Sequence, residues 1–148
     1  MKIIEAAAQR LGVELHLLPV QDPKDLERTF SAMVERGVQA LVVFPGGMFV
    51  AQTAQIIVLA AQTRLPAMYG VREYAAVGGL MTYGANLAEM NRDVGARFVD
   101  SILRGANPGE LSIAQPTKFE LLINLKTATA LGLTVPTSLR LRADELIQ

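Results

Sequence analysis

The sequence of 148 residues has no cysteine and only one histidine, and each shortage excludes a class of site. Without cysteine there is no disulfide, no thiolate metal site and no cysteine nucleophile. One imidazole, that of His16, builds neither a catalytic triad nor a multi-histidine metal site. We therefore expect His16 to be a structural or solvent-facing residue, and we predict no metal.

The chain also lacks net charge and long apolar runs. Its 14 Lys and Arg residues balance 14 Asp and Glu residues, so it has no electrostatic reason to bind nucleic acid or anionic lipid. No run of about 18 apolar residues is present to span a membrane. The first residues, 1–5, reach a charge after a short apolar stretch and do not read as a signal peptide.

Motifs for catalysis are missing as well. Gly79 and Gly84 have the first spacing of a phosphate-binding loop, but Ala85-Asn86 stands where Lys followed by Ser or Thr is required. Asp93, Arg97 and Asp100 have the helical spacing of a solvated ion-pair face. With no nucleophile and base pair and no cofactor loop, we predict that the chain is not an enzyme and holds no cofactor.

What is present is an alternation of strand and helix patterns. The segment 40–44 is apolar at every residue, which is typical of a strand covered on both faces of a parallel sheet. Strands are predicted at 13–20, 40–44 and 67–69, and helices at 3–11, 23–36 and 49–64. Short connections between them indicate an α/β fold with a doubly wound parallel sheet.

The second half of the chain changes character. A strand at 80–83 leads to Asn86 and Glu89, which have capping-box spacing. The helix that follows, about 87–104, carries an apolar stripe made of Met90, Val94, Phe98 and Ile102. Further elements are predicted as strands at 111–114 and 119–123, a helix capped by Asn124 that runs to 131, and a helix at 138–147.

Two loops leave the carboxyl ends of the predicted strands, where open α/β sheets bind ligands. The first holds Gly46, Gly47, Met48 and Phe49, and its glycines let backbone N–H groups approach a ligand. The second, 70–74, offers the planar donor fork of Arg72 to a carboxylate. Equally, the glycines serve a tight turn, and Arg72 pairs with Glu73 or solvent.

Aromatic residues near these loops suit an amino-acid-like ligand. Met48, Phe49, Tyr69, Tyr74 and Tyr83 together offer an apolar or aromatic wall beside Arg72. Core packing explains some of these residues equally well, and Tyr69, at the end of a buried strand, is the first candidate for the core. The predicted ligand-binding set is Gly46, Gly47, Met48, Phe49, Arg72, Tyr74 and Tyr83.

Several segments resemble one known family. Residues 72–75, 78–84 and 142–145, and above all the long stretch 115–136, are similar to the ABC-transporter substrate-binding family related to tryptophan and tyrosine transport. The resemblance covers essentially the whole chain. It implies a type I periplasmic-binding fold, in which two α/β lobes joined by a hinge close around a small organic solute. Family members act outside the cytoplasm, in the periplasm or its equivalent, and deliver the solute to ABC permease subunits.

The resemblance also implies how the chain is organised. It begins inside the first helix of the second lobe, so residues 1–78 form an incomplete lobe without its first strand. Residues 79–148 form the hinge crossing and a C-terminal segment that returns toward the other lobe. An alternative is an effector-binding or sensor domain of a regulatory protein with the same fold, although the sequence holds no basic helical module for DNA.

A missing central strand carries a further expectation. The strands at 13–20 and 40–44 would lose a neighbour, and unpaired strand edges attract another strand. The stripe on the 87–104 helix would also lose the sheet that it covers in the family. We therefore expect this chain to form a homodimer that covers both surfaces.

Overall fold

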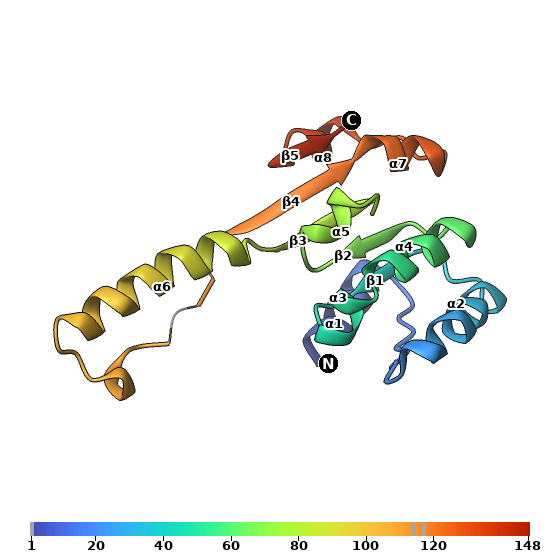
Figure 1. Ribbon diagram of the computed structural model, residues 1–148. Coiled ribbons are helices and arrows are strands. Elements are labelled where there is room, and N and C mark those ends of the chain that lie inside the picture. Colours follow the sequence, from blue (N-terminus) through green and yellow to red (C-terminus); the bar gives the residue numbers. More distant parts are fainter. Residues whose placement is uncertain (1, 114, 117) are drawn as a thin grey trace.

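The computed structural model describes residues 2–113, 115–116 and 118–148, and its centre is one mixed β-sheet (Figure 1). The five strands lie in chain order across the sheet: β1 (Leu41–Val43), β2 (Ala67–Tyr69), β3 (Met81–Ala85), β4 (Phe119–Asn124) and β5 (Glu145–Ile147). β1, β2 and β3 are parallel, β4 is antiparallel to β3, and β5 is parallel to β4. The predicted α/β fold and the parallel pairing of the 40–44 and 67–69 strands are confirmed.

Helices connect and cover these strands. The described helices are α1 (Lys2–Leu11), η1 (Pro23–Asp25), α2 (Leu26–Glu35), α3 (Gly47–Ala51), α4 (Thr53–Gln62), α5 (Glu73–Ala76), α6 (Leu87–Leu103), η2 (Pro108–Glu110), α7 (Leu125–Ala130) and α8 (Thr137–Arg140). The helices predicted at 3–11, 23–36, 49–64, 87–104 and from Asn124 are all present, with some divided into two pieces. Asn124 caps α7 as expected, because its Oδ1 accepts a hydrogen bond from Thr127 N at 3.0 Å.

The core lies on one face of the sheet. Strand register places Val43, Tyr69, Thr82 and Leu122 in one row across four strands, and all four are buried. Two helices cover the β1 and β2 end of this row with buried side chains, namely Leu26, Phe30 and Met33 on α2, and Ile56 and Ala60 on α4. The short helix α5 lies against β3 and β4. Each large apolar side chain buried in this way contributes about 1.5–3 kcal/mol to folding.

One member of the buried row is polar. Thr82 is 1% exposed, and its hydroxyl has no hydrogen-bond partner within the described part of the chain. An unpartnered buried hydroxyl has lost its water without gaining a replacement, so Thr82→Val is expected to raise the free energy of unfolding by about 1 kcal/mol. Urea denaturation measures the change. The matched control is Thr127→Val, which removes a 2.9 Å bond to the Gly78 carbonyl and should lower the same free energy. If Thr82→Val loses as much stability as the control, the Thr82 hydroxyl does have a hydrogen-bond partner, and the interpretation is wrong.

The strand predicted at 13–20 is wrong. This segment runs without regular structure and makes no backbone ladder with any described strand. Val13, Leu15 and Leu17 stay 57%, 39% and 41% exposed, while Leu18 and Val20 pack at the margin of the core. The alternating pattern predicted a strand, but a strand exists only when a neighbour pairs with it, and β1 is paired here on one side, by β2.

Two predictions near the C-terminus are also wrong. Residues 111–113 form no strand, and Ala114, the last of that predicted strand, lies outside the described residues. The predicted 138–147 helix is instead the short α8 followed by β5. Asp144 explains the change, since its backbone N–H donates to Leu121 O at 2.9 Å and its carboxylate accepts from Leu121 N at 2.8 Å. Pairing with β4 overrides the local helical pattern.

The chain leaves the sheet between β3 and β4. α6 extends away from the sheet as an arm, and the following segment runs back to β4 (Figure 1). Asn86 caps α6 by accepting a bond from Glu89 N at 2.9 Å, as predicted, although the Glu89 carboxylate binds Lys118 rather than completing the box. No residue of α6 is buried, and Ile102 of the apolar stripe is 42% exposed.

Candidate functional site

Three parallel strands end at the same edge of the sheet, and their backbones meet there. A Cβ added to Gly70 would lie 2.5 Å from Cδ of Pro45, and one added to Gly84 would overlap the carbonyl oxygen of Gly70. No side chain fits at either glycine. The chain after β1, the chain after β2 and the end of β3 are therefore in direct contact, and they form a rigid floor for this edge.

A groove of about 430 Å³ lies beside that floor. It falls within the usual size of small-molecule sites, roughly 300–1,000 Å³. Its lining is mostly apolar and includes Val42, Phe44, Met68, Tyr83, Leu87 and Phe119. Tyr83 on β3 and Phe119 on β4 stack with ring centroids 5.9 Å apart, and both are about half exposed. The groove is therefore suited to a flat apolar or aromatic group.

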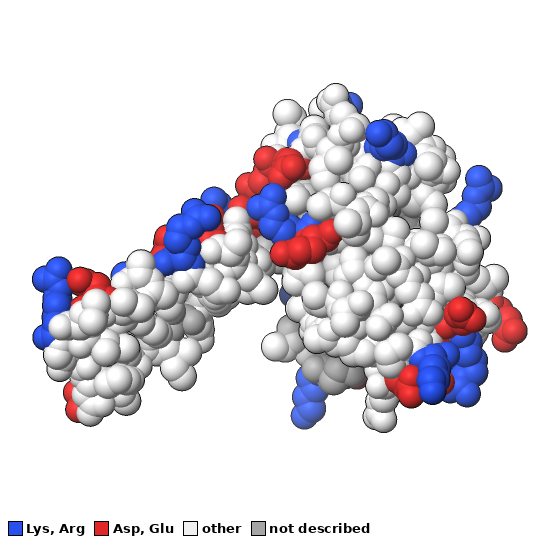
Figure 2. Space-filling view, viewed as in Figure 1, with Lys and Arg blue, Asp and Glu red and all other residues white. Residues whose placement is uncertain are grey.

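Charged side chains gather at the same edge of the sheet but on its other face, because Glu120 points away from the neighbouring Phe119 of β4. Glu120 on β4 accepts hydrogen bonds from Arg72 at 3.2 Å and from the Asn86 amide at 2.8 Å. Arg72 also pairs with Glu145 at 3.1 Å, and Lys118 lies 3.7 Å from Glu120. We call Arg72, Asn86, Lys118, Glu120 and Glu145 the junction cluster. Figure 2 shows acidic and basic side chains grouped where α6 meets the body.

The junction cluster is partly shielded from water. The Glu120 side chain is 12% exposed, whereas those of Arg72 and Glu145 are 42% and 51% exposed. Lys118 joins the arm to the cluster by a 3.0 Å bond to Glu89, and that bond raises the pKa of Lys118. The ammonium therefore stays charged at neutral pH. Such a cluster presents both signs of charge to a ligand.

The predicted site residues separate into two groups. Arg72 and Tyr83 lie at the carboxyl edge, one in the junction cluster and the other in the groove. Arg72 pairs with neither Glu73 nor solvent alone, as the simpler interpretation expected, but with two carboxylates far away in sequence. Gly46 precedes α3 as its N-cap, Gly47 begins that helix and is exposed, and Met48 is half-buried.

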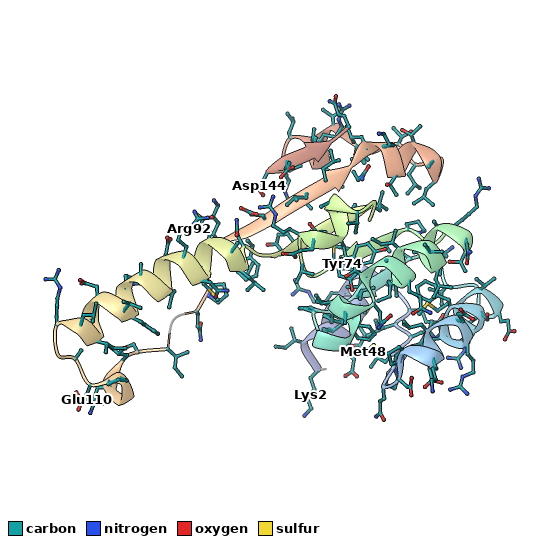
Figure 3. All side chains as sticks on the ribbon, viewed as in Figure 1. Lys2, Met48, Tyr74, Arg92, Glu110 and Asp144 are labelled. Carbon is teal, nitrogen blue, oxygen red and sulfur yellow. The ribbon has the colours of Figure 1, made fainter. Side chains whose placement is uncertain are left out.

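Tyr74 and Phe49 face the body of the protein. Tyr74 is 2% exposed, its ring stacks on Tyr69 at 4.3 Å, and its hydroxyl donates to the Phe49 carbonyl. Burial raises the pKa of Tyr74. Figure 3 shows Tyr74 within the body of the molecule. Tyr69 is a core residue as expected, and Tyr74 holds the α3 segment in place instead of opening onto the groove.

Sequence reasoning missed three residues of this region: Phe119, Glu120 and Glu145. Phe119 and Glu120 were placed on a strand, without a partner, and Glu145 was placed on a helix. The signal available was the alternation Lys118-Phe119-Glu120 at the start of a strand, which puts the aromatic ring on one face and the two charges on the other. Glu120 and Glu145 both pair with Arg72, which lies 48 and 73 residues away from them in sequence, so no local pattern connects these residues.

Among residues 2–113, 115–116 and 118–148, no three His, Cys, Asp or Glu side chains are grouped to hold a metal ion. In that same part of the chain, every helix is too short or too polar to cross a bilayer.

Comparison with known protein families shows which family this chain belongs to. The family model described as ABC transporter substrate binding protein matches residues 1–147. The chain belongs to this family. The resemblance seen in residues 72–84 and 115–136 is confirmed. Among curated proteins, no sequence matches the chain.

Solved structures show the same fold for this member of the ABC transporter substrate binding protein family. An ABC domain in complex with L-Trp from Streptococcus pneumonia has a TM-score of 0.86 and 21% identity, and the match covers 99% of this chain and 50% of that one. A conserved domain protein from Vibrio cholerae has a TM-score of 0.83 and 22% identity, with 98% and 48% covered. A ligand-free, open substrate binding protein with adhesive properties from Clostridium difficile has a TM-score of 0.66 and 16% identity, with 99% and 48% covered. The chain spans about half the length of these structures.

Proposed function

We propose that this chain contributes one side of a cleft that binds a small amino-acid-like solute for an ABC-type uptake system. The observation that carries the proposal is that the junction cluster and the aromatic groove lie at the same edge of the sheet, on opposite faces of β3 and β4. An amino acid with an apolar side chain needs both features, since its ammonium and carboxylate require charged partners and its side chain requires an apolar wall. The neighbour described with L-Trp supports a ligand of this kind.

The proposal includes the organisation of the protein. Residues 1–78 form a second-lobe unit, and residues 79–148 form the hinge crossing and the C-terminal segment. The remaining side of the cleft comes from a first lobe, which corresponds to the half of the solved neighbours that this chain does not cover. The full-length protein acts outside the cytoplasm, hands its solute to ABC permease subunits and catalyses no reaction. A regulatory sensor with this fold would bind its effector at the same edge but would not support uptake.

Within the cleft, the residues have separate roles. Tyr83 contributes the aromatic wall, and Arg72 offers a donor to the solute carboxylate. Gly46, Gly47, Met48 and Phe49 follow Pro45 directly and flank the floor of the edge. Tyr74 acts indirectly, because its hydroxyl holds the Phe49 carbonyl.

The solute class is tested with a thermal-shift screen of the protein that carries both lobes. A ligand that binds only the folded state raises its melting temperature. Aromatic and large apolar amino acids are expected to raise it, whereas apolar amines without a carboxylate are expected to have no effect. If no amino acid or small organic acid raises the melting temperature, the proposed solute class is wrong.

Arg72→Ala is expected to weaken solute binding by about 1.5 kcal/mol, roughly tenfold in Kd, through loss of a charge-assisted hydrogen bond. Isothermal titration calorimetry of the two-lobe protein measures this change. Arg36→Ala serves as a control, because Arg36 is an exposed residue at the end of α2, away from the carboxyl edge. An unchanged Kd in Arg72→Ala would reassign Arg72 to holding Glu120 and Glu145 alone.

We also propose that the 148-residue chain on its own is a homodimer. Val42 on the outer strand β1 and Phe44 just after it are 49% and 50% exposed, and Ile102 and Leu103 at the end of α6 are 42% and 81% exposed. Apolar surface next to an unpaired strand edge favours self-association. Light scattering at micromolar concentration is expected to give twice the chain mass of 16.0 kDa. A monodisperse species of the single-chain mass would refute the dimer.

A further inference from the structure

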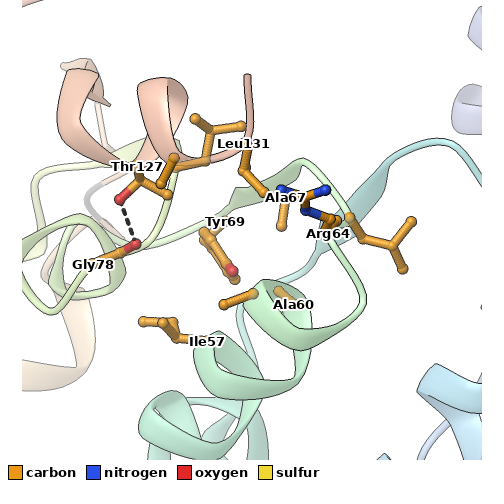
Figure 4. A pocket seen from close by; sticks show the side chains of 12 residues that line it. Ile57, Ala60, Arg64, Ala67, Tyr69, Gly78, Thr127 and Leu131 are labelled. Carbon is orange, nitrogen blue, oxygen red and sulfur yellow. Dashed lines mark hydrogen bonds between the residues drawn. The ribbon is translucent and has the colours of Figure 1, made fainter. Parts of the chain in front are cut away.

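A second cavity lies away from the carboxyl edge, between α4, the start of β2 and α7 (Figure 4). Its volume is about 110 Å³, and Tyr69 is the single residue that it shares with the aromatic groove. Most of its lining is apolar and comes from both halves of the chain: Ile57, Ala60, Ala61, Leu65, Ala67 and Leu80 on one side, and Ala130 and Leu131 on the other.

One polar group inside this cavity is left without a partner. Tyr69 is 2% exposed as a residue, and its hydroxyl has no hydrogen-bond partner among the described residues. The hydroxyl oxygen itself keeps some contact with solvent, because Thr82 alone holds a fully buried unpartnered side-chain atom in the described part of the chain. Figure 4 shows the Tyr69 ring among the lining side chains with its hydroxyl turned toward α4. Burial raises the pKa of Tyr69 to about 12, so the hydroxyl remains a neutral donor over the physiological range. This donor is therefore available to an acceptor that enters the cavity.

A second donor, Arg64, stands at the rim in a rare backbone conformation. Its φ is 54°, the one positive φ of a non-glycine residue in the described part of the chain. It follows the last turn of α4, where Leu65 N donates to Ala60 O at 3.0 Å, a helix ending at which glycine is the usual residue. Arg64 keeps this conformation although glycine would relieve the strain. Its side chain is exposed and takes part in none of the ion pairs found among the described residues.

The other polar groups of the cavity are already satisfied. Thr127 donates its hydroxyl proton to the Gly78 carbonyl at 2.9 Å, as the dashed line in Figure 4 marks. The cavity therefore offers two donors, one of them cationic, and an apolar remainder. A carboxylate supplies the matching acceptors and charge, and a short hydrocarbon chain matches the apolar wall.

We propose that this cavity is a second binding site, distinct from the solute cleft, for a small monocarboxylate with a short apolar chain. The volume sets the upper size, because about 110 Å³ equals three to four water molecules at ~30 Å³ each. Butyrate fits this limit, and an aromatic amino acid exceeds it. Since the cavity is closed on one side by α4 and on the other by α7, the bound acid connects residues 1–78 to the C-terminal segment and stabilises their contact.

The test uses the 148-residue chain and butyrate as the probe. Titration is followed by thermal shift and by ¹H–¹⁵N NMR, with 1-butanol and butylamine as probes of the same chain length without the carboxylate. For so small a ligand a Kd on the order of 1 mM is expected. Saturable shifts confined to α4, β2 and α7 with butyrate, and none with butylamine, are the expected result.

Variants then separate recognition from packing. Arg64→Gly removes the guanidinium and also relieves the positive φ, so the fold should be as stable as before or more stable, while the butyrate Kd rises about tenfold. Tyr69→Phe keeps the ring and should also weaken butyrate binding. Arg92→Gln, a change to an exposed arginine of α6, is the control and should bind as the native chain does.

Three results would overturn the proposal. The first is the absence of saturable shifts up to about fifty times the expected Kd. The second is an equal response to 1-butanol, which would mark an apolar void without carboxylate recognition. The third is an unchanged butyrate Kd in Arg64→Gly.

Discussion

Gly84→Ala is expected to lower the free energy of unfolding by about 3 kcal/mol or more, because the new methyl group would overlap the Gly70 carbonyl oxygen. The atoms that this methyl group would meet all belong to the backbone of Gly70, so no side chain can rotate away to make room. Gly70 is itself pressed against Pro45, which blocks relaxation in that direction. The strain should also displace the floor of the carboxyl edge and weaken solute binding in whatever protein still folds.

Gly95→Ala is the matched control for this substitution. Gly95 lies within α6, and a Cβ there would meet nothing within 4 Å. Alanine is the better helix former, so this change should stabilise the chain by about 0.5–1 kcal/mol. Urea denaturation of both variants measures the difference. Equal midpoints for Gly84→Ala and the native chain would show that β3 and the loop after β2 are not in contact.

Stability is expected to decline under alkaline conditions by about 3 kcal/mol between pH 10 and pH 12. Burial raises the pKa of Tyr69 from 10.0 to about 12, and the pKa of Tyr74, stacked on it, shifts in the same direction. The folded state therefore keeps these protons to a higher pH than the unfolded state. The contribution of the protonated Tyr69 hydroxyl to stability is fully present below pH 10, where this group is protonated in both the folded and the unfolded state. That contribution is lost as the pH rises through 12.

Tyr69→Phe tests the cause of that decline. Phenylalanine fills the same space without an ionisable group, so the loss of stability between pH 10 and pH 12 should become much smaller. Denaturant titrations at a series of pH values supply the comparison. If the native chain and Tyr69→Phe lose stability in parallel above pH 10, the ionisation of Tyr69 is not responsible.

The elements predicted correctly are those whose signal lies within the element itself. The apolar run 40–44 and the capping residue Asn124 needed no distant partner to be recognised. The segment 13–20 and the C-terminal β5 depended on a neighbour instead. The first has the alternation of a strand and no strand beside it, and the second has a helical pattern that is overridden by pairing with β4.

The same distinction applies to the site. Arg72 and Tyr83 were predicted because the carboxyl ends of parallel strands meet at one edge. Glu120 and Glu145 were missed because they reach Arg72 only through the pairing of β4 with β3 and β5. Tyr74 was predicted as part of an aromatic wall, but its ring stacks on Tyr69 inside the core, and the residue sequence does not specify which way a loop tyrosine turns.

The route of the chain into and out of α6 has a mechanical consequence. The two connections are neighbouring strands that still pair at their last residues, Ala85 opposite Phe119, with Asn86 N bonded to Lys118 O at 3.4 Å just beyond. The first turn of α6 is tied to the same place, because Glu89 bonds Lys118 at 3.0 Å and the Asn86 amide bonds Glu120 at 2.8 Å. Any movement of α6 relative to the sheet therefore has its pivot at this first turn, beside Arg72 and Glu120, and a change in the ion pairs of that cluster would alter the direction of the helix.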